Sequence, residues 1–457
     1  MFSIINFVFY FLLQILTGYV FLLSLNLQRQ LNTIELLAIS YGIGMGITSM
    51  FVFLFNFDFL FSFLTMVFLI ITFLIINRKR ITFDLRFLYR PFSKSEKVLS
   101  SIIIFIVLYV FFLAVIYPME SRDSLLIWGL KAKAIYLKGG FPFDLLKESD
   151  PDIFHLDYPL LIPIQEVLFY NFLGRFDDAL VKVIFAVWYL SFLIIFYFLL
   201  RRFILRKFAL IFVLFLASLL RLGRFFSNGY ADSVMAFYFS LGFLFLYLGY
   251  IKEKNNFFYL SAILSSIGGW VKNEGIAWCL INFMLLWIVA FLYYFKNEKN
   301  KSWEVKKGII FYVIMMLIFI LPWQVFRIRY ALKSDILREG FFSLSRFLKN
   351  IERLYYISCV YLKEFFNFKN WNLVWILFLF SFLLNIKNVF SKKYFLFTGL
   401  FLGFFGILSI IYILTYKDLH WHLTNSVDRL FIHIVPTVIF WMAIFFEDRL
   451  IDKIDIE

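Results

Sequence analysis

The chain consists of apolar runs of about 18–25 residues that follow one another, separated by short polar or basic segments. A helix of about 20 residues spans the hydrocarbon core of a bilayer, so each run predicts a membrane-spanning helix. Of the 457 residues, 63% are hydrophobic and only 16% are charged, which is more apolar surface than a soluble domain can bury. We therefore expect an all-α, polytopic membrane protein. In this class the net charge of +15 reflects topology and lipid contacts, and nucleic acid is excluded as a partner.

The apolar runs predict about 13 transmembrane helices. They cover residues 4–25, 34–55, 59–77, 98–118, 179–200, 208–226, 233–251, 257–271, 276–295, 308–330, 372–387, 393–416 and 429–447. The first run lacks a preceding basic segment and a small-residue cleavage site, so we interpret it as a retained span. Cys279 and Cys359 have no spacing typical of a metal or redox site.

Four connections between these spans are strongly basic, and the positive-inside rule places all four in the cytoplasm. Their basic residues are Arg78, Lys79, Arg80, Arg86, Arg90, Lys94 and Lys97; Arg201, Arg202, Arg206 and Lys207; Lys296, Lys299, Lys301, Lys306 and Lys307; and Lys387, Lys392 and Lys393. The short run 159–173 contains Pro159, Pro163 and Glu166, and a crossing there would invert every later span. We interpret it as an interfacial or re-entrant helix, which leaves the N-terminus outside and the C-terminus in the cytoplasm.

This topology places several polar segments together on the outer face, at residues 119–158, 228–232, 272–274 and 416–429. A longer outer stretch, 331–371, has apolar residues near helical spacing and is expected to lie along the membrane surface. These residues are Leu337, Phe341, Leu344, Phe347, Leu348 and Ile351. The predicted organisation is a three-span extension with a basic loop (1–97), a core (98–447) with a first outer loop at 119–160, and a cytoplasmic tail (448–457).

Two outer acids are candidates for chemistry. Asp123 follows a span, beside Glu120 and Arg122, and a partly desolvated carboxylate there could act as a general base. The alternative is that Asp123 is the N-cap of the amphipathic segment that follows it. Asp232 also precedes an apolar run, so it is either a second N-cap or a carboxylate that converges with Asp123 on one pocket.

Basic and histidine side chains supply candidates for binding a phosphate. Lys272 and Glu274, at a span boundary, could meet a phosphate or could merely extend to the interface. Arg429 is suited to bidentate phosphate contact, although an ion pair with Asp428 or Asp418 is the alternative. His420 and His422 are two residues apart and do not share a helix face, which disfavours a metal pair. The chain has no Walker, GxGxxG or HExxH motif.

The order of these elements resembles the GT-C superfamily of glycosyltransferases, which includes protein O-mannosyltransferases and lipid A aminoarabinose transferases. Asp123 follows an early span, the proline motif HLDYPLLIP (155–163) ends the first outer loop, Asp232 comes later, and Lys272 begins a Lys–Gly element. The ending WHLTNSVDRLFIHIVP resembles a motif of a less characterised bacterial branch. The resemblance covers roughly residues 98–447.

The chain departs from this family pattern in three places. Three extra spans precede the first-loop span, and Glu120-Ser-Arg-Asp123 replaces the tandem Asp-Glu of the mannosyltransferases. The histidine of the proline motif is displaced to His155, and Asp157-Tyr158 stand before the proline. These departures leave the substrate open, and also the choice between Asp123 and Glu120 as base.

The resemblance implies a GT-C-like fold and an inverting transferase that takes a sugar from a polyprenyl-phosphate donor. Asp123 would be the base and Asp232 a helper, and the two could hold a divalent metal, although no cofactor is required. Arg429, Lys272 and His422 would contact the donor phosphate. The remaining candidates, for the acceptor or other roles, are Glu120, His155, Asp157, Tyr158, Glu274 and His420.

The expected location is the inner (plasma) membrane of a bacterium or archaeon, with the active site facing the periplasm or outside. The expected partners are membrane lipids, the polyprenyl-phosphate sugar donor and a glycan, lipid or protein acceptor. The main alternative is a lipid-carrier or polysaccharide transporter or flippase without catalysis, and a structural subunit of an envelope assembly is a third. A transporter should place charges inside its spans, whereas the sequence gathers them at one face.

Overall fold

The structure is a computed structural model that describes residues 2–81, 84, 91–143, 155–332, 334 and 341–454. Every element in these ranges is a helix, which confirms the all-α prediction. Some sequence predictions lie outside the described residues. They concern Arg86, Arg90, Leu337, parts of the segments 119–160 and 331–371, and residues 455–457 of the tail.

The first half of the chain forms α1 (Phe2–Ser24), η1 (Gln28–Gln30), α2 (Thr33–Leu54), α3 (Phe59–Ile76), η2 (Arg78–Arg80), α4 (Lys94–Ile116), η4 (Asp123–Gly129), α5 (Leu130–Lys138), α8 (Leu161–Leu173), η5 (Leu180–Lys182), α9 (Val183–Leu200), α10 (Arg206–Ala217) and α11 (Leu220–Ser227). The second half forms α12 (Ala231–Lys252), α13 (Asn255–Val271), α14 (Glu274–Phe295), α15 (Lys299–Phe319), α16 (Leu321–Arg329), α17 (Leu344–Lys349), α18 (Arg353–Phe365), α19 (Phe368–Trp371), α20 (Val374–Leu384), η6 (Ile386–Asn388), α21 (Phe395–Leu414) and α22 (Leu419–Ile454).

Within the described ranges, ten helices are long and apolar enough to cross a membrane, or eleven if the bent pair α10–α11 forms one span. This confirms a polytopic helical protein. A helix also lies at each of the thirteen predicted positions, but α13 and α20 are not among these eleven. The 11 residues of α20 extend only ~16 Å, about half of the ~30 Å hydrocarbon core. The short α8 has 13 residues, in keeping with a segment that does not cross.

The predicted basic segments meet at one end of the bundle. Phe203, which follows α9, lies against Lys252 at the end of α12, with the ammonium 5.3 Å from the ring centroid. The next residue, Glu253, forms ion pairs with Lys301 and with Lys392, each at 3.0 Å. These contacts join the second, third and fourth basic segments.

The first basic segment lies at the same end. Arg206 forms a bidentate pair with Glu96 at the start of α4, at 2.7 and 2.8 Å. Arg202 reaches Glu35 at the start of α2 in the same manner, at 2.7 and 2.8 Å. The four basic segments therefore share one end, as the predicted topology requires.

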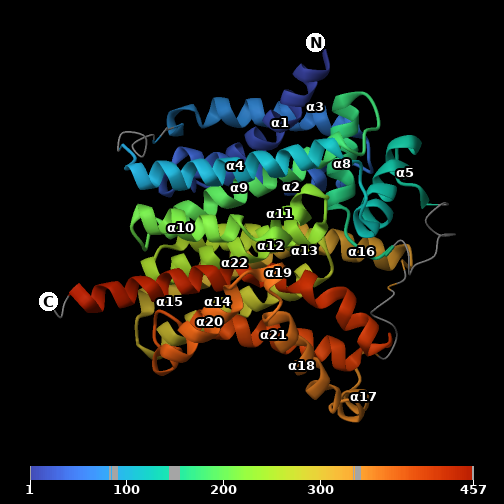
Figure 1. Ribbon diagram of the computed structural model, residues 1–457. Coiled ribbons are helices and arrows are strands. Elements are labelled where there is room, and N and C mark those ends of the chain that lie inside the picture. The colour runs from blue at the N-terminus through green and yellow to red at the C-terminus, as the bar shows by residue number, and fades with distance from the viewer. Residues whose placement is uncertain are drawn as a thin grey trace.

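The long central helix α12 separates this basic end from the opposite end. Its 22 residues correspond to ~33 Å, enough to cross the hydrocarbon core. The helix begins beside Asp232 and ends beside Glu253, so the Asp232 end lies a membrane thickness away from the basic end. Figure 1 shows the helices side by side, with α5 and α16 at the end opposite the C-terminus of α22.

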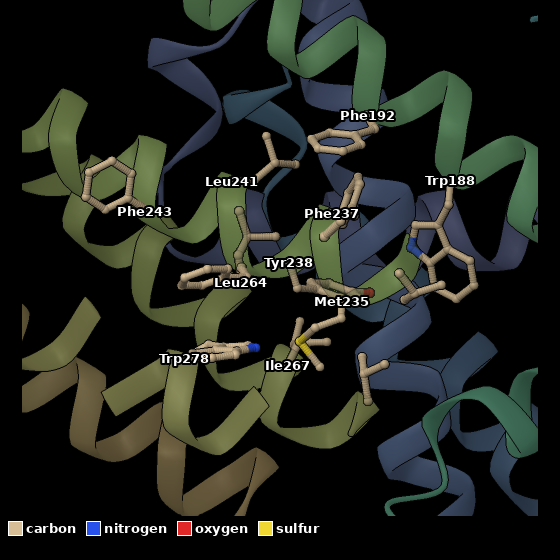
Figure 2. Close-up of a cluster of buried hydrophobic side chains, with 14 of the residues drawn as sticks. Trp188, Phe192, Met235, Phe237, Tyr238, Leu241, Phe243, Leu264, Ile267 and Trp278 are labelled. Carbon is tan, nitrogen blue, oxygen red and sulfur yellow. The ribbon is translucent and has the colours of Figure 1, made fainter. Parts of the chain in front are cut away.

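Aromatic packing fixes the position of α12. Phe237 and Tyr238 are fully buried, and Trp188 of α9 and Trp278 of α14 lie in the same cluster (Figure 2). The Tyr238 hydroxyl donates to the carbonyl of Gly42 at 2.6 Å. A side chain on Gly42 would meet the ring of Phe237 at 2.6 Å, so α2 can approach α12 only through a glycine. This packing holds the first turn of α12, and with it Asp232, in one place.

The arrangement of the two ends predicts the outcome of cysteine labelling. In a Cys359→Ser background, Lys392→Cys and Thr424→Cys introduce exposed thiols at the basic end and the opposite end, respectively. A membrane-impermeant maleimide added to intact cells should label Thr424→Cys, whereas Lys392→Cys should react only after the membrane is opened. Labelling of both positions from the same side would contradict the two-ended arrangement.

Candidate functional site

A cavity of about 950 Å³ opens at the end of the bundle where α12 begins. Its walls come mainly from η4, the segment before α8, the start of α12, the α13–α14 turn, α16, α21 and the first turns of α22. Eight of the eleven site residues predicted from the sequence line this cavity, although they come from distant parts of the chain. They are Asp123, His155, Tyr158, Asp232, Lys272, Glu274, His422 and Arg429.

One part of the cavity wall is polar and is formed by Asp232, Lys272 and Arg429. Asp232 lies at the centre of this polar wall. Its carboxylate is only 1% exposed, and both of its oxygens are engaged. Oδ1 accepts a hydrogen bond from the Lys272 ammonium at 2.8 Å, and Oδ2 accepts from Nε and Nη2 of Arg429 at 3.2 and 3.1 Å. The N-cap interpretation of Asp232 is therefore wrong, because Tyr230 occupies the cap position and the Asp232 side chain binds the two cations instead.

A third partner of Asp232, His433, was missed by the sequence reasoning. Nε2 of His433 lies 3.4 Å from Oδ1 of Asp232, and the imidazole is fully buried. The indole N–H of Trp278 donates to Nδ1 at 3.2 Å, so the neutral ring carries its proton on Nε2, facing the carboxylate. His433 follows Arg429 by four residues on α22, and this helical spacing in an apolar run was the available signal.

Lys272 lies in the tight turn between α13 and α14. Its side chain is buried and pairs with Asp232 and, at 3.2 Å, with Glu274, so it does not extend to the interface. Burial disfavours the charged form, but the two carboxylates outweigh burial and raise the pKa of Lys272 above its usual value. The turn depends on Gly275, because a side chain there would meet the carbonyl of Gly268 at 2.0 Å. The close approach of α13 and α14 thus fixes the ammonium.

Arg429 joins the two predicted acids. Besides Asp232, its Nη2 contacts Oδ2 of Asp123 at 2.5 Å, and both of these side chains are about one-fifth exposed. The predicted alternative partners lie elsewhere: Asp428 contacts Arg221, and Asp418 accepts a hydrogen bond from a backbone N–H in the first turn of α22. The alternative that Arg429 pairs with Asp428 or Asp418 in its own segment is therefore wrong.

Asp123 is the first residue of η4, a seven-residue π-helix. This rare geometry is found most often as short insertions near functional sites. The N-terminus of η4 has no side-chain cap, and the carboxylate of Asp123 is directed to Arg429. The N-cap interpretation of Asp123 is thus not supported by the geometry.

Three stacked rings form an aromatic wall of the cavity. Tyr158 lies between Trp128 and His155, at centroid distances of 5.5 and 4.9 Å and interplanar angles of 19° and 18°. His155 has a left-handed backbone (φ 44°), and its carbonyl accepts a hydrogen bond from the Lys131 ammonium at 2.7 Å. Burial lowers the pKa of Lys131 to about 7, although the nearby carboxylate of Asp157 opposes this shift.

Three predicted site residues do not line the cavity. Glu120 is exposed, outside the cavity wall. Asp157 is buried behind the wall, where Oδ2 accepts a hydrogen bond from the amide of Asn273 at 2.7 Å. His420 is exposed, with Nδ1 2.6 Å from the hydroxyl of Tyr356. Of the two candidate bases, only Asp123 therefore reaches the cavity.

Among the described residues, the charged side chains that line the cavity are five cations and three carboxylates. The cations exceed the carboxylates by two, which favours an anionic ligand over a neutral or cationic one. The lining cations include three that the sequence analysis did not single out as ligand contacts, namely Arg122, Arg327 and Lys417. His422 also lines the cavity, with its Nδ1 2.9 Å from the hydroxyl of Thr415.

The described residues contain no cluster of three or more His, Cys, Asp or Glu side chains that could hold a metal ion. Asp123 and Asp232, the predicted metal contacts, both bind Arg429 instead. A divalent metal at this pair stays a prediction of the sequence analysis.

Comparison of the chain with protein-family models found no match, and comparisons with curated proteins and with solved structures found none either.

The buried ammonium of Lys131 predicts a pH dependence of stability. Its pKa is about 7 in the folded protein and ~10.5 in the unfolded chain, so between these values the unfolded chain binds more protons. The free energy of unfolding should therefore rise as pH increases from 7 toward 10, by at most ~1.4 kcal/mol per pH unit for this group. Lys131→Met should be less sensitive to pH in thermal unfolding of the detergent-solubilised protein. Equal pH slopes for the two proteins would contradict the assignment.

Proposed function

We propose that the protein is an inverting glycosyltransferase that takes a sugar from a polyprenyl-phosphate carrier. One observation carries this proposal: the carboxylate of Asp123 and the cations Arg429 and Lys272 converge on one cavity that also has an apolar wall. An anion on a long apolar chain is the ligand that suits both parts of this cavity. The sequence order of the acids and the proline motif supports the same function by resemblance.

The polar wall suits the phosphate of the donor. A guanidinium binds phosphate oxygens in a bidentate manner, and a buried ammonium adds a second positive charge. Arg429 and Lys272 are both held by Asp232, so they are in place before a ligand arrives. Preorganised cations of this kind stabilise the negative charge that grows on a leaving phosphate.

The apolar wall suits the isoprenoid chain. Residues of α14 and α21 form this wall, and Leu280 and Ile410 on it are each about 40% exposed. In a membrane this exposed surface faces acyl chains, so a lipid chain can pass from the bilayer to the cavity without crossing a polar region. The wall residues are Ile276, Ala277, Leu280, Ile407, Leu408, Ile410 and Ile411.

The aromatic wall suits a sugar, because the C–H face of a pyranose packs on a flat ring system. Trp128, Tyr158 and His155 supply such rings on the same cavity as Asp123. In the proposed reaction, an acceptor hydroxyl attacks the anomeric carbon, and Asp123 takes the hydroxyl proton. The bond between the anomeric carbon and the phosphate oxygen breaks, and polyprenyl phosphate leaves against Arg429 and Lys272.

In this mechanism Asp232 positions the two cations and does not exchange protons, since both of its oxygens already accept hydrogen bonds from Lys272 and Arg429. The cavity lies opposite the basic end of the bundle. The positive-inside rule therefore favours an active site on the periplasmic or outer face of the inner membrane.

The test measures release of polyprenyl phosphate by the purified full-length protein in proteoliposomes. A panel of polyprenyl-phosphate-linked hexoses and pentoses serves as donors, and a membrane-lipid and glycan extract serves as the acceptor source. Asp123→Asn should lower the rate about 10²–10⁴-fold, the usual contribution of a general base. Glu120→Gln should retain most activity, because Glu120 does not line the cavity.

Thermal unfolding of both variants controls for loss of fold. The proposal fails if the wild-type protein releases polyprenyl phosphate from no donor, or if it only moves donors across the bilayer without cleaving them. Full activity of folded Asp123→Asn would remove Asp123 from the mechanism.

A further inference from the structure

The guanidinium of Arg429 has two edges that can hold an anion in a bidentate manner. Asp232 occupies the edge formed by Nε and Nη2, at 3.2 and 3.1 Å. Asp123 contacts the same Nη2 at 2.5 Å. This short contact is an ion pair that places the Asp123 carboxylate directly against Nη2. No residue in the described ranges accepts a hydrogen bond from Nη1.

A phosphate that binds Arg429 through two hydrogen bonds needs one of these edges. The edge formed by Nε and Nη2 is not available, because Asp232 occupies it. The side chain of Asp232 is only 2% exposed, and Lys272 and His433 also hold it. The remaining edge, formed by Nη1 and Nη2, includes the nitrogen against which the Asp123 carboxylate lies at 2.5 Å. The ligand and Asp123 therefore compete for the same donor.

The two carboxylates differ in how firmly they are held. Asp123 is one-fifth exposed, and Arg429 is the only partner recorded for its side chain among the described residues. It also lies at the first residue of the π-helix η4, whose N-terminus has no side-chain cap. Displacing Asp123 costs one ion pair, whereas displacing Asp232 would leave a buried charge without its full set of partners.

We propose that Asp123 is a latch on the anion site, and that the phosphate of the donor displaces it from Arg429. This inference rests on the proposed function and adds its regulation. In the free protein the carboxylate of Asp123 is committed to Arg429 and cannot accept a proton from an acceptor. When a phosphate takes the Nη1–Nη2 edge, Asp123 is released into the cavity, beside the sugar.

The latch sets the order of the reaction. The donor binds first and frees the base, so an acceptor or water that enters an empty cavity meets Asp123 still paired with Arg429. The exchange of Asp123 for phosphate leaves the number of anionic partners of Arg429 unchanged. These partners are Asp232 and Asp123 before the donor binds, and Asp232 and the phosphate afterwards.

The experiment measures anion binding to the purified full-length protein in detergent, by calorimetry and thermal shift. The probes are inorganic phosphate and geranylgeranyl monophosphate, with geranylgeraniol as the uncharged counterpart of the second. Asp123→Asn should bind phosphate about three- to tenfold more tightly than the wild type, because it removes the competitor for Nη2. Asp232→Asn should bind it at least about tenfold more weakly, because Arg429 and Lys272 lose their support.

Glu120→Gln is the matched control, because it removes one negative charge from the same loop but outside the cavity wall. Its affinity should stay within about twofold of the wild type. Asp123→Ser is a second variant, for use if Asp123→Asn does not fold, and should also bind more tightly.

The latch is overturned if folded Asp123 variants bind phosphate no more tightly than the wild type, or if they bind no anion. It is also overturned if Glu120→Gln tightens binding equally, since that indicates a general charge effect. Asp123→Asn could bind inorganic phosphate more tightly than the wild type while neither the wild type nor any variant binds geranylgeranyl monophosphate. That result would support the latch and would contradict the proposed lipid donor.

Discussion

The buried carboxylate of Asp232 holds the polar site together. It lies in the first turn of α12, the most deeply buried of the candidate spans in the described ranges, and it is bound by Lys272, Arg429 and His433. A carboxylate removed from water is costly unless charges and hydrogen bonds compensate it, and here three segments far apart in the sequence supply them. The pairing therefore joins α12 to the α13–α14 turn and to α22. It also presents two cations to one cavity before any ligand is bound.

The site combines one fixed pair with one exchangeable pair. Arg429 is anchored to the interior through Asp232 and meets the cavity through Asp123. The fixed pair supplies preorganised positive charge, which is what a leaving phosphate needs. The exchangeable pair keeps the candidate base occupied until an anion replaces it. On this account, substrate binding and activation of the base are one event, and they depend on the two edges of a single guanidinium.

Much of the helical architecture could be predicted from the sequence, because a run of apolar residues that spans a bilayer is a local signal. A helix lies at each predicted position, and the basic segments share one end. The count of spans was less predictable: α20 is too short to cross, and α10–α11 bends by 64°. In the site, the residue types at Asp123, Asp232, Lys272 and Arg429 were visible, but their pairing was not. Sequence reasoning offered local partners as the alternatives, namely helix caps for the acids and Asp428 or Asp418 for Arg429, whereas the actual partners come together only through packing. His433 was missed because its role depends on Trp278 and Asp232, which are remote in the chain.

The most direct test of this account is a cryo-electron microscopy structure of the protein in a lipid nanodisc with geranylgeranyl monophosphate bound. The phosphate should take the Nη1–Nη2 edge of Arg429. Asp232 should then keep its contacts with Lys272 and Arg429, and the Asp123 carboxylate should have moved away from Arg429 into the cavity. A structure in which the phosphate binds elsewhere while Asp123 remains on Arg429 would contradict it.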